Sequence, residues 1–205
     1  MILCYVLGPI IRHYTHPRVV GKDNLAALDP PVVFAANHSS HIDTPLLLRA
    51  LPVRWRLSTA VVAAADYFFR NRLIAGLVSL AFGAIPVDRR TGRSRDSTER
   101  LNEVVRSSRS ILVYPEGTRS RDGRMGVLRS GAASLALENR IPLVPVHLRG
   151  TYEAMPPGRW WPRRNPVTVS FGAPIRPQPG DDRKTLTARL HESLAKLSVE
   201  AARDT

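Results

Sequence analysis

The residues best suited to chemistry are His38 and Asp43, which lie in the segment 32–45. Residues 32–36 are apolar, which is typical of a buried strand, and Thr44, followed by a proline, predicts the N-cap of a helix. Histidine side chains titrate near neutral pH and can take a proton from a hydroxyl group. A loop that folds back would let Asp43 bind one imidazole nitrogen and stabilise the imidazolium. We therefore expect His38 to act as a general base and Asp43 to orient it.

The same segment allows other readings. Ser39 and Ser40 could be nucleophiles, although no Gly-x-Ser-x-Gly sequence surrounds them. His38, His41 and Asp43 could bind a metal ion, although no second cluster of ligands occurs elsewhere in the sequence. The histidines could also be ordinary residues of a surface loop, and this is the interpretation we favour for His41.

Composition limits the class of protein. A chain of 205 residues is most simply one domain, large enough to bury a core. Its single cysteine excludes an internal disulfide and is compatible with a reducing compartment. The net charge of +13 implies an anionic partner such as a membrane surface, a phosphorylated substrate or a nucleic acid. The positive charge is scattered and no nucleic-acid-binding motif occurs, so we expect no specific nucleic-acid partner.

Two apolar segments, 1–11 and 73–87, are shorter than the roughly 20 residues that a membrane-spanning helix requires. Each can be read either as buried core or as a segment that enters a membrane interface. We expect residues 1–18 to form a short membrane-proximal lead-in. Trp160 and Trp161, which arginines flank, also suit a membrane interface, but could instead cover the edge of the core.

Apolar runs alternate with segments that have helical patterns, which predicts an α/β domain over residues 19–205. Such alternation is typical of a mostly parallel sheet flanked by helices, with the active site at the carboxyl ends of the strands. The strands are expected at 32–36, 55–63, 83–87, 111–114, 143–148 and 167–171. The helices are expected at 45–51, 66–80, 96–109, 130–139 and over the stripe of Leu186, Leu190, Leu194 and Leu197.

Polar residues follow three of these strands. His38 and Asp43 follow the first, Arg89 the strand at 83–87, and Glu116 and Arg119 the strand at 111–114. Parallel strands would bring these side chains to one edge of the sheet. The sequence therefore predicts a base beside two arginines, an arrangement suited to an anionic molecule whose hydroxyl group loses its proton.

Four motifs occur in a fixed order along the chain. The first, at 37–43, is Asn-His followed by Asp five residues after the histidine. The second, at 83–89, is a glycine and an apolar run that end in Asp-Arg. The third, at 114–120, is Tyr-Pro-Glu-Gly-Thr-Arg-Ser, and the fourth, at 144–146, is Val-Pro-Val. Together they resemble the glycerolipid acyltransferase family, of the 1-acylglycerol-3-phosphate acyltransferase type. The resemblance extends over residues 19–171.

This resemblance implies transfer of a fatty acyl group from acyl-CoA or acyl carrier protein to a glycerolipid hydroxyl in phospholipid biosynthesis. His38, held by Asp43, would take the hydroxyl proton, and the alkoxide would attack the thioester directly without an acyl-enzyme. The thioester is a substrate, so the family resemblance implies no cofactor and no metal. Arg89 and Arg119 would bind the acceptor phosphate, and Glu116 would bind or orient the acceptor.

The resemblance also places Gly117 and Thr118 in the substrate-binding loop, where the backbone at Gly117 would make a close turn. A salt bridge between Glu116 and Arg119 is the alternative role for the glutamate. The sequence departs from the family pattern at three places: Tyr114 stands for the commoner phenylalanine, Pro86 lies in the second motif, and 128–131 lacks the usual aromatic residue.

The expected acceptor is 1-acylglycerol-3-phosphate, but another lysophospholipid, a glycolipid or a lipid alcohol would require the same chemistry. We expect peripheral attachment to the cytoplasmic face of an anionic membrane. A remote alternative is a non-catalytic basic module that binds a membrane or a nucleic acid.

Overall fold

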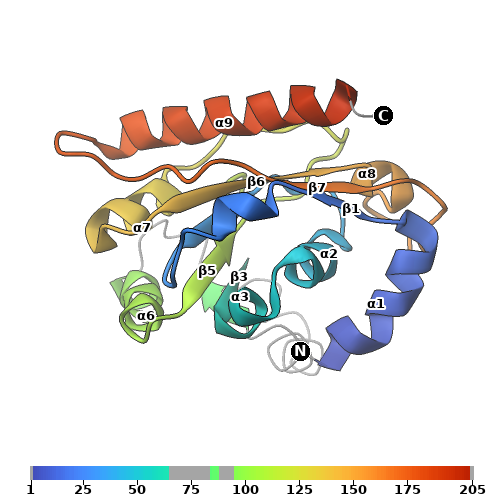
Figure 1. Cartoon of the computed structure of the whole chain (residues 1–205), viewed down its shortest axis with the longest axis horizontal. Coiled ribbons are helices and arrows are strands. Elements are labelled where there is room, and N and C mark those ends of the chain that lie inside the picture. Colours follow the sequence, from blue (N-terminus) through green and yellow to red (C-terminus); the bar gives the residue numbers. More distant parts are fainter. Residues whose placement is uncertain (1, 65–83, 88–94, 204–205) are drawn as a thin grey trace.

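The computed structural model describes residues 2–64, 84–87 and 95–203. Within these ranges one sheet of seven strands runs through the molecule in the order β1-β7-β6-β2-β5-β3-β4 (Figure 1). The strands are β1 (Arg18–Val20), β2 (Val33–Ala36), β3 (Thr59–Ala64), β4 (Ala84–Val87), β5 (Ser110–Val113), β6 (Leu143–Arg149) and β7 (Thr168–Phe171). All neighbouring pairs are parallel except β6 and β7. The expected single α/β domain with a mostly parallel sheet is confirmed.

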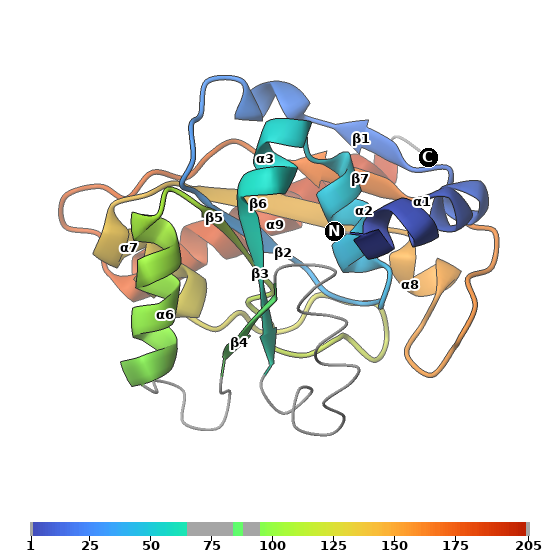
Figure 2. The same cartoon turned by 90° about the horizontal axis from the view of Figure 1, so that it is seen from below.

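Helices cover both faces of this sheet (Figures 1 and 2). They are α1 (Ile2–Thr15), the 3-10 helix η1 (Lys22–Leu25), α2 (Asp43–Ala50), α3 (Val53–Ser58), α6 (Arg95–Arg106), α7 (Gly131–Asn139), α8 (Thr151–Ala154) and α9 (Arg183–Arg203). None of the helices in the described part of the chain combines the length and the apolar character needed to cross a membrane.

The alternation of side chains along β2 divides the core into two layers. Phe34 and Ala36 pack with α2 and α3 on one face, whereas Val33 and Ala35 pack with α6, α7 and α9 on the other. The leucine stripe expected on the last helix is confirmed, because Leu186, Leu190, Leu194 and Leu197 are buried. The central strand is therefore buried on both faces, as its continuous apolar sequence predicts.

The predicted strand at 55–63 is partly wrong. Residues up to Ser58 form α3, and the strand begins at Thr59. Trp55 is fully buried in this helix, with its ring edge-on to Phe34 at a centroid distance of 5.6 Å. A short apolar segment does not distinguish a strand from a turn of helix by periodicity alone, so the packing of Trp55 decides the local structure.

Thr44 is not the N-cap of the helix that follows β2. The helix α2 begins at Asp43, and the residue in the cap position is Ile42. The Thr44 hydroxyl instead makes a hydrogen bond with the hydroxyl of Tyr114 at 2.8 Å. The cap prediction failed because a long-range partner, which no local pattern reveals, engages the threonine side chain.

The remaining expected elements differ from the observed ones only at their ends where the structure describes them. The helix expected at 96–109 ends at Arg106, and Ser108 follows in a left-handed backbone conformation. The expected strand at 83–87 is observed over Ala84–Val87. The helix expected at 66–80 and the proposed phosphate ligand Arg89 lie outside the described residues.

Candidate active site

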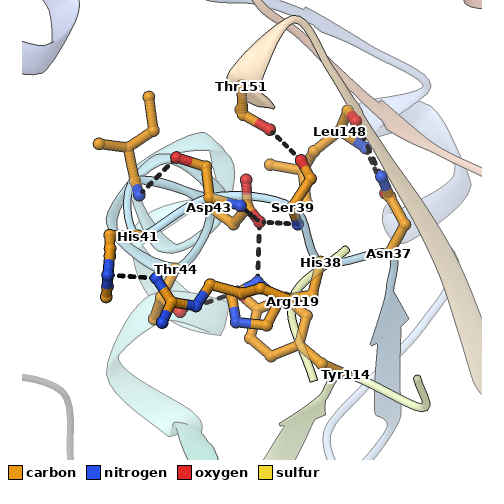
Figure 3. A network of polar contacts seen from close by, with 12 residues as sticks. Asn37, His38, Ser39, His41, Asp43, Thr44, Tyr114, Arg119, Leu148 and Thr151 are labelled. Carbon is orange, nitrogen blue, oxygen red and sulfur yellow. Dashed lines mark hydrogen bonds and ion pairs between the residues drawn. The ribbon is translucent and has the colours of Figure 1, made fainter. Parts of the chain in front are cut away.

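His38 lies two residues beyond the carboxyl end of β2, and the loop after it folds back as the sequence predicted. The Nδ1 atom of His38 is 2.8 Å from Oδ2 of Asp43 (Figure 3). The Asp43 side chain is fully buried, and 19% of the His38 side chain is exposed. An ionised carboxylate can only accept hydrogen bonds, so Nδ1 carries the proton and Nε2 is left as the basic nitrogen.

The Asp43 carboxylate organises this loop. Its Oδ2 atom also accepts hydrogen bonds from the backbone N–H groups of Ser39 at 2.7 Å and Ser40 at 2.8 Å. The residue stands in the first turn of α2, where the helix dipole favours a negative charge. One oxygen atom thus fixes both the loop backbone and the His38 imidazole.

The ring of Tyr114 covers one face of the His38 imidazole. The two rings stack with centroids 4.0 Å apart and an interplanar angle of 17°. Burial raises the pKa of Tyr114 well above its usual value, with a further contribution from the negative charge of Asp43. The phenol therefore stays protonated and bonded to Thr44. This hydrogen bond holds the ring that stacks on His38 against the start of α2.

Glu116 holds the backbone of the same residue. Its Oε1 atom accepts the N–H of His38 at 2.7 Å, and its Oε2 atom accepts the N–H of Gly126 at 2.7 Å. The side chain is 9% exposed, and burial raises its pKa while the two backbone hydrogen bonds oppose that rise. Among the described residues no ion pair joins Glu116 to Arg119.

The loop after β5 meets the segment that carries His38. The Ser120 N–H donates to the His38 carbonyl at 2.8 Å, and the Gly117 N–H donates to the Tyr114 carbonyl at 2.9 Å. Gly117 has a φ of +76°, and a Cβ atom there would lie 3.0 Å from Nε of Arg129. The expected close turn at Gly117 is therefore observed, and Thr118 is exposed beside it.

Arg119 extends from this loop to His41, and one guanidinium N–H contacts Nε2 of that histidine (Figure 3). Burial lowers the pKa of His41, and the charges of Arg119 and His38 lower it further. A neutral imidazole can accept the guanidinium hydrogen bond. His41, which we expected to be an ordinary residue of a surface loop, is therefore the residue that contacts Arg119.

The two serines of the loop have structural partners. The Ser39 hydroxyl lies 3.0 Å from the Thr151 hydroxyl, and the Ser40 hydroxyl donates to the Met155 carbonyl at 2.6 Å. Both serines are buried. Neither forms the contact with His38 that a nucleophilic serine requires. Ser39 attaches the loop to α8, and Ser40 attaches it to the residue that follows this helix.

Asn37 and Leu148 hold the end of β2, next to His38, in place. The Asn37 side chain donates to the Leu148 carbonyl at 2.9 Å and accepts the Leu148 N–H at 2.7 Å. This bidentate contact joins the end of β2 to β6. Sequence patterns gave no signal for Leu148, Thr151 or Met155, which contribute through backbone groups or a single hydroxyl.

Another interpretation of the motif is a metal site. Within the ranges that the structure describes, no three His, Cys, Asp or Glu side chains gather closely enough to hold a metal ion. His41 is engaged by Arg119 rather than by Asp43. The geometry of the described site is that of an oriented base next to a cation.

Comparisons with known proteins show the family of the chain. The family model described as Acyltransferase matches residues 16–149, a range that contains all four sequence motifs. The chain is 33% identical over 141 residues to the chloroplastic 1-acyl-sn-glycerol-3-phosphate acyltransferase BAT2 of Brassica napus, an alignment that covers 68% of this chain and 39% of that protein. The corresponding chloroplastic protein LPAT1 of Arabidopsis thaliana is also 33% identical over 141 residues, with 68% and 38% coverage.

A solved structure has the same fold. It is the 1-acyl-sn-glycerophosphate acyltransferase PlsC of Thermotoga maritima, with a TM-score of 0.75, 22% sequence identity and coverage of 96% of this chain and 78% of that chain. The chain spans about two fifths of the length of the two plant relatives. The family model, in contrast, matches most of the chain. This chain therefore belongs to the acyltransferase family.

Proposed function

We propose that this protein transfers a fatty acyl group from an acyl thioester to the free hydroxyl of 1-acylglycerol-3-phosphate, which yields phosphatidic acid for phospholipid biosynthesis. The observation that carries the proposal is the pair of His38 and Asp43, 2.8 Å apart at the carboxyl edge of the sheet. No hydrogen bond joins Nε2 of His38 to another described residue, so this nitrogen is available to a substrate hydroxyl. The acyl donor is either acyl-CoA or acyl carrier protein.

In the proposed reaction Nε2 of His38 takes the hydroxyl proton while the oxygen attacks the thioester carbonyl carbon. The new C–O ester bond forms, the C–S bond breaks, and the thiolate leaves with the proton that the imidazolium returns. Asp43 stabilises the imidazolium between these two proton transfers. A positioned base of this kind contributes about 10²–10⁴-fold to the rate, and holding two substrates together contributes the rest.

We assign the acceptor phosphate to Arg119 and to Arg89, which lies outside the described residues. Arg119 supports this role because its neighbour Ser120 is bonded to the His38 backbone, which keeps the guanidinium near the base. A guanidinium can form two parallel hydrogen bonds to phosphate oxygens. Gly117 and Thr118 form the turn that carries Arg119 toward the acceptor.

We assign Glu116 a positioning role instead of direct contact with the acceptor. Both of its oxygen atoms already accept backbone N–H groups, from His38 and from Gly126. A carboxylate would also repel the acceptor phosphate. These contacts therefore support a role for Glu116 in holding the backbone of His38.

The proposed reaction takes place at a membrane surface because its acceptor and product are amphiphiles that reside in bilayers. We place the protein peripherally on the cytoplasmic face. The proposed chemistry needs no cofactor, since the activated acyl group arrives on the thioester substrate.

The test is the formation of phosphatidic acid from 1-acylglycerol-3-phosphate, measured by mass spectrometry with acyl-CoA and with acyl carrier protein as donors. Monoacylglycerol, lysophosphatidylcholine and a fatty alcohol serve as comparison acceptors. The proposal predicts thiol release that depends on the phosphorylated acceptor with at least one donor. Equal rates with monoacylglycerol would contradict the phosphate assignment, and thiol release without any acceptor would identify a thioesterase.

A further inference from the structure

A group of aromatic and basic side chains, all of them exposed except the half-buried Tyr14, lies where the loop 156–166 meets the last turn of α1. We call this group the interfacial patch, and it consists of Tyr14, Arg159, Trp160, Trp161, Arg163 and Arg164. None of these residues belongs to the site described above. Figure 2 shows the loop beside α8, at the same end of the molecule as α1.

The two tryptophans of the patch face solvent. Trp160 is 94% exposed and Trp161 is 55% exposed, values unusual for the largest apolar side chain. Trp161 packs edge-on against Tyr14 of α1, with ring centroids 5.9 Å apart. Indole and phenol rings are amphipathic and concentrate where a bilayer meets water. Their exposure therefore fits a lipid interface better than the edge of a core.

The three arginines of the patch contact two backbone carbonyls and a histidine. Arg159 donates to the Trp161 carbonyl, Arg163 to the Glu153 carbonyl, and Arg164 lies 3.5 Å from His13. No ion pair within the described part of the chain includes these three arginines. Three positive charges on the rim of an aromatic surface are complementary to an anionic one.

The loop is held firmly to the fold. The N–H groups of Asn165 and Val167 donate to the carbonyls of Tyr14 and Thr15 at 3.0 and 2.9 Å, and the Arg163 N–H donates to the Ala154 carbonyl at 2.9 Å. These bonds fix the loop between α1 and α8. The patch is therefore an ordered part of the fold, and these hydrogen bonds hold the loop in a position where Trp160 and Trp161 are exposed.

The same helix connects the patch to the loop that carries the base. α8 ends at Ala154, which holds the patch loop, and its Thr151 hydroxyl contacts Ser39. The next residue, Met155, accepts the Ser40 hydroxyl. One short helix thus fixes the position of the interfacial patch relative to the candidate active site.

We infer that the interfacial patch docks the protein onto an anionic phospholipid bilayer, with its arginines at the phosphates and its indoles among the headgroups. This inference rests on the proposed function, because docking would bring the edge of the sheet that holds His38 close to an acceptor in the bilayer. Each arginine near such a surface strengthens binding several-fold, so three contribute roughly a hundredfold at low ionic strength.

The experiment measures co-sedimentation of the full chain with vesicles of phosphatidylcholine, with and without phosphatidylglycerol. Replacement of Arg159, Arg163 and Arg164 by Gln should weaken binding to the anionic vesicles by roughly a hundredfold. The matched control removes the same charge from α9, by replacement of the exposed Arg183, Lys184 and Arg203 with Gln. The control should change binding only a few-fold, and an equal loss in both variants would overturn the assignment to this patch.

A second readout follows the indoles. The chain has three tryptophans, of which Trp55 is fully buried, so quenching by brominated lipid reports on Trp160 and Trp161. We expect quenching in anionic vesicles that Trp160→Ala and Trp161→Ala together abolish. No quenching in the natural chain, or duplex DNA that binds the same patch and displaces vesicles, would overturn the inference.

A soluble, short-chain 1-acylglycerol-3-phosphate separates this inference from the proposed function. Patch variants should transfer acyl groups to that monomeric acceptor at the natural rate and lose activity only with acceptor held in anionic vesicles. If the natural chain binds vesicles through the patch but acylates neither acceptor, the proposed function fails while the docking surface stands.

Discussion

The carboxylate of Glu116 accepts the backbone N–H of His38 at 2.7 Å. The proposed base is therefore held twice, since Asp43 binds its imidazole and Glu116 binds its backbone. A rotation of the loop would disturb both contacts. The position and orientation of His38 therefore depend on two buried carboxylates.

Replacement of Glu116 by Gln should lower kcat about 10- to 100-fold with little change in the KM for the acceptor. An amide presents an N–H group to one of the two backbone donors, and an unpaired buried donor costs about 1–3 kcal/mol. Gly126→Ala should act in the same direction, because the new Cβ atom would lie 3.2 Å from Oε2 of Glu116. Steady-state kinetics check both variants.

The control for this pair is Glu103→Gln, which changes an exposed glutamate on α6. It should leave kcat and the melting temperature unchanged. A large rise in the acceptor KM of Glu116→Gln with kcat intact would instead mean that Glu116 contacts the acceptor, as the family resemblance suggested.

Tyr114→Phe should keep the stacking on His38 and remove only the hydrogen bond to Thr44. We expect a loss of about 1 kcal/mol in the free energy of unfolding and a small change in kcat, whereas Tyr114→Leu should lower kcat more. Thr44→Val should match Tyr114→Phe in stability. The double variant should then be no less stable than either single one, and fully additive losses would show that the two hydroxyls do not interact.

Acid should destabilise the protein through His147. Burial lowers the pKa of this histidine to about 4, with a smaller contribution from Arg149. Between pH 6.5 and 4 the unfolded chain therefore binds a proton at this histidine that the folded protein does not bind. The free energy of unfolding falls as the pH falls through that window. The loss from this one group is about 3 kcal/mol. Urea unfolding at pH 7 and pH 4.5 should show a smaller loss for His147→Gln than for the natural chain, and equal losses would refute this account.

Arg119→Gln should raise the KM for 1-acylglycerol-3-phosphate at least tenfold and leave the rate with any unphosphorylated acceptor unchanged. His41→Ala removes the acceptor of the guanidinium hydrogen bond and should raise the same KM by a smaller factor, because Arg119 loses its orientation. Arg121→Gln, which changes an exposed arginine of the same loop, is the matched control. An equal rise in KM for phosphorylated and unphosphorylated acceptors would argue against the phosphate assignment.

Local patterns in the sequence predicted the parallel α/β architecture because buried strands and helices alternate regularly. They also predicted that His38 and Asp43 meet, since five residues are enough for a loop to fold back. They failed at Trp55, whose helix depends on packing against Phe34, and at Thr44, whose partner Tyr114 lies 70 residues away.

The supporting contacts of the site escaped prediction for the same physical reason. Thr151 acts through one hydroxyl, and Leu148 and Met155 act through backbone groups that every residue type possesses. Glu116 was correctly placed near the site by its motif, but its two backbone partners depend on how two loops meet in space.

The most direct measurement is the rate of phosphatidic acid formation by His38→Ala, with 1-acylglycerol-3-phosphate binding measured in parallel. We expect a rate about 10²–10⁴-fold below that of the natural chain, with acceptor affinity unchanged. His191→Ala, which removes an exposed histidine from α9, should keep the natural rate. A His38→Ala rate within tenfold of natural would contradict the central claim that His38 is the base.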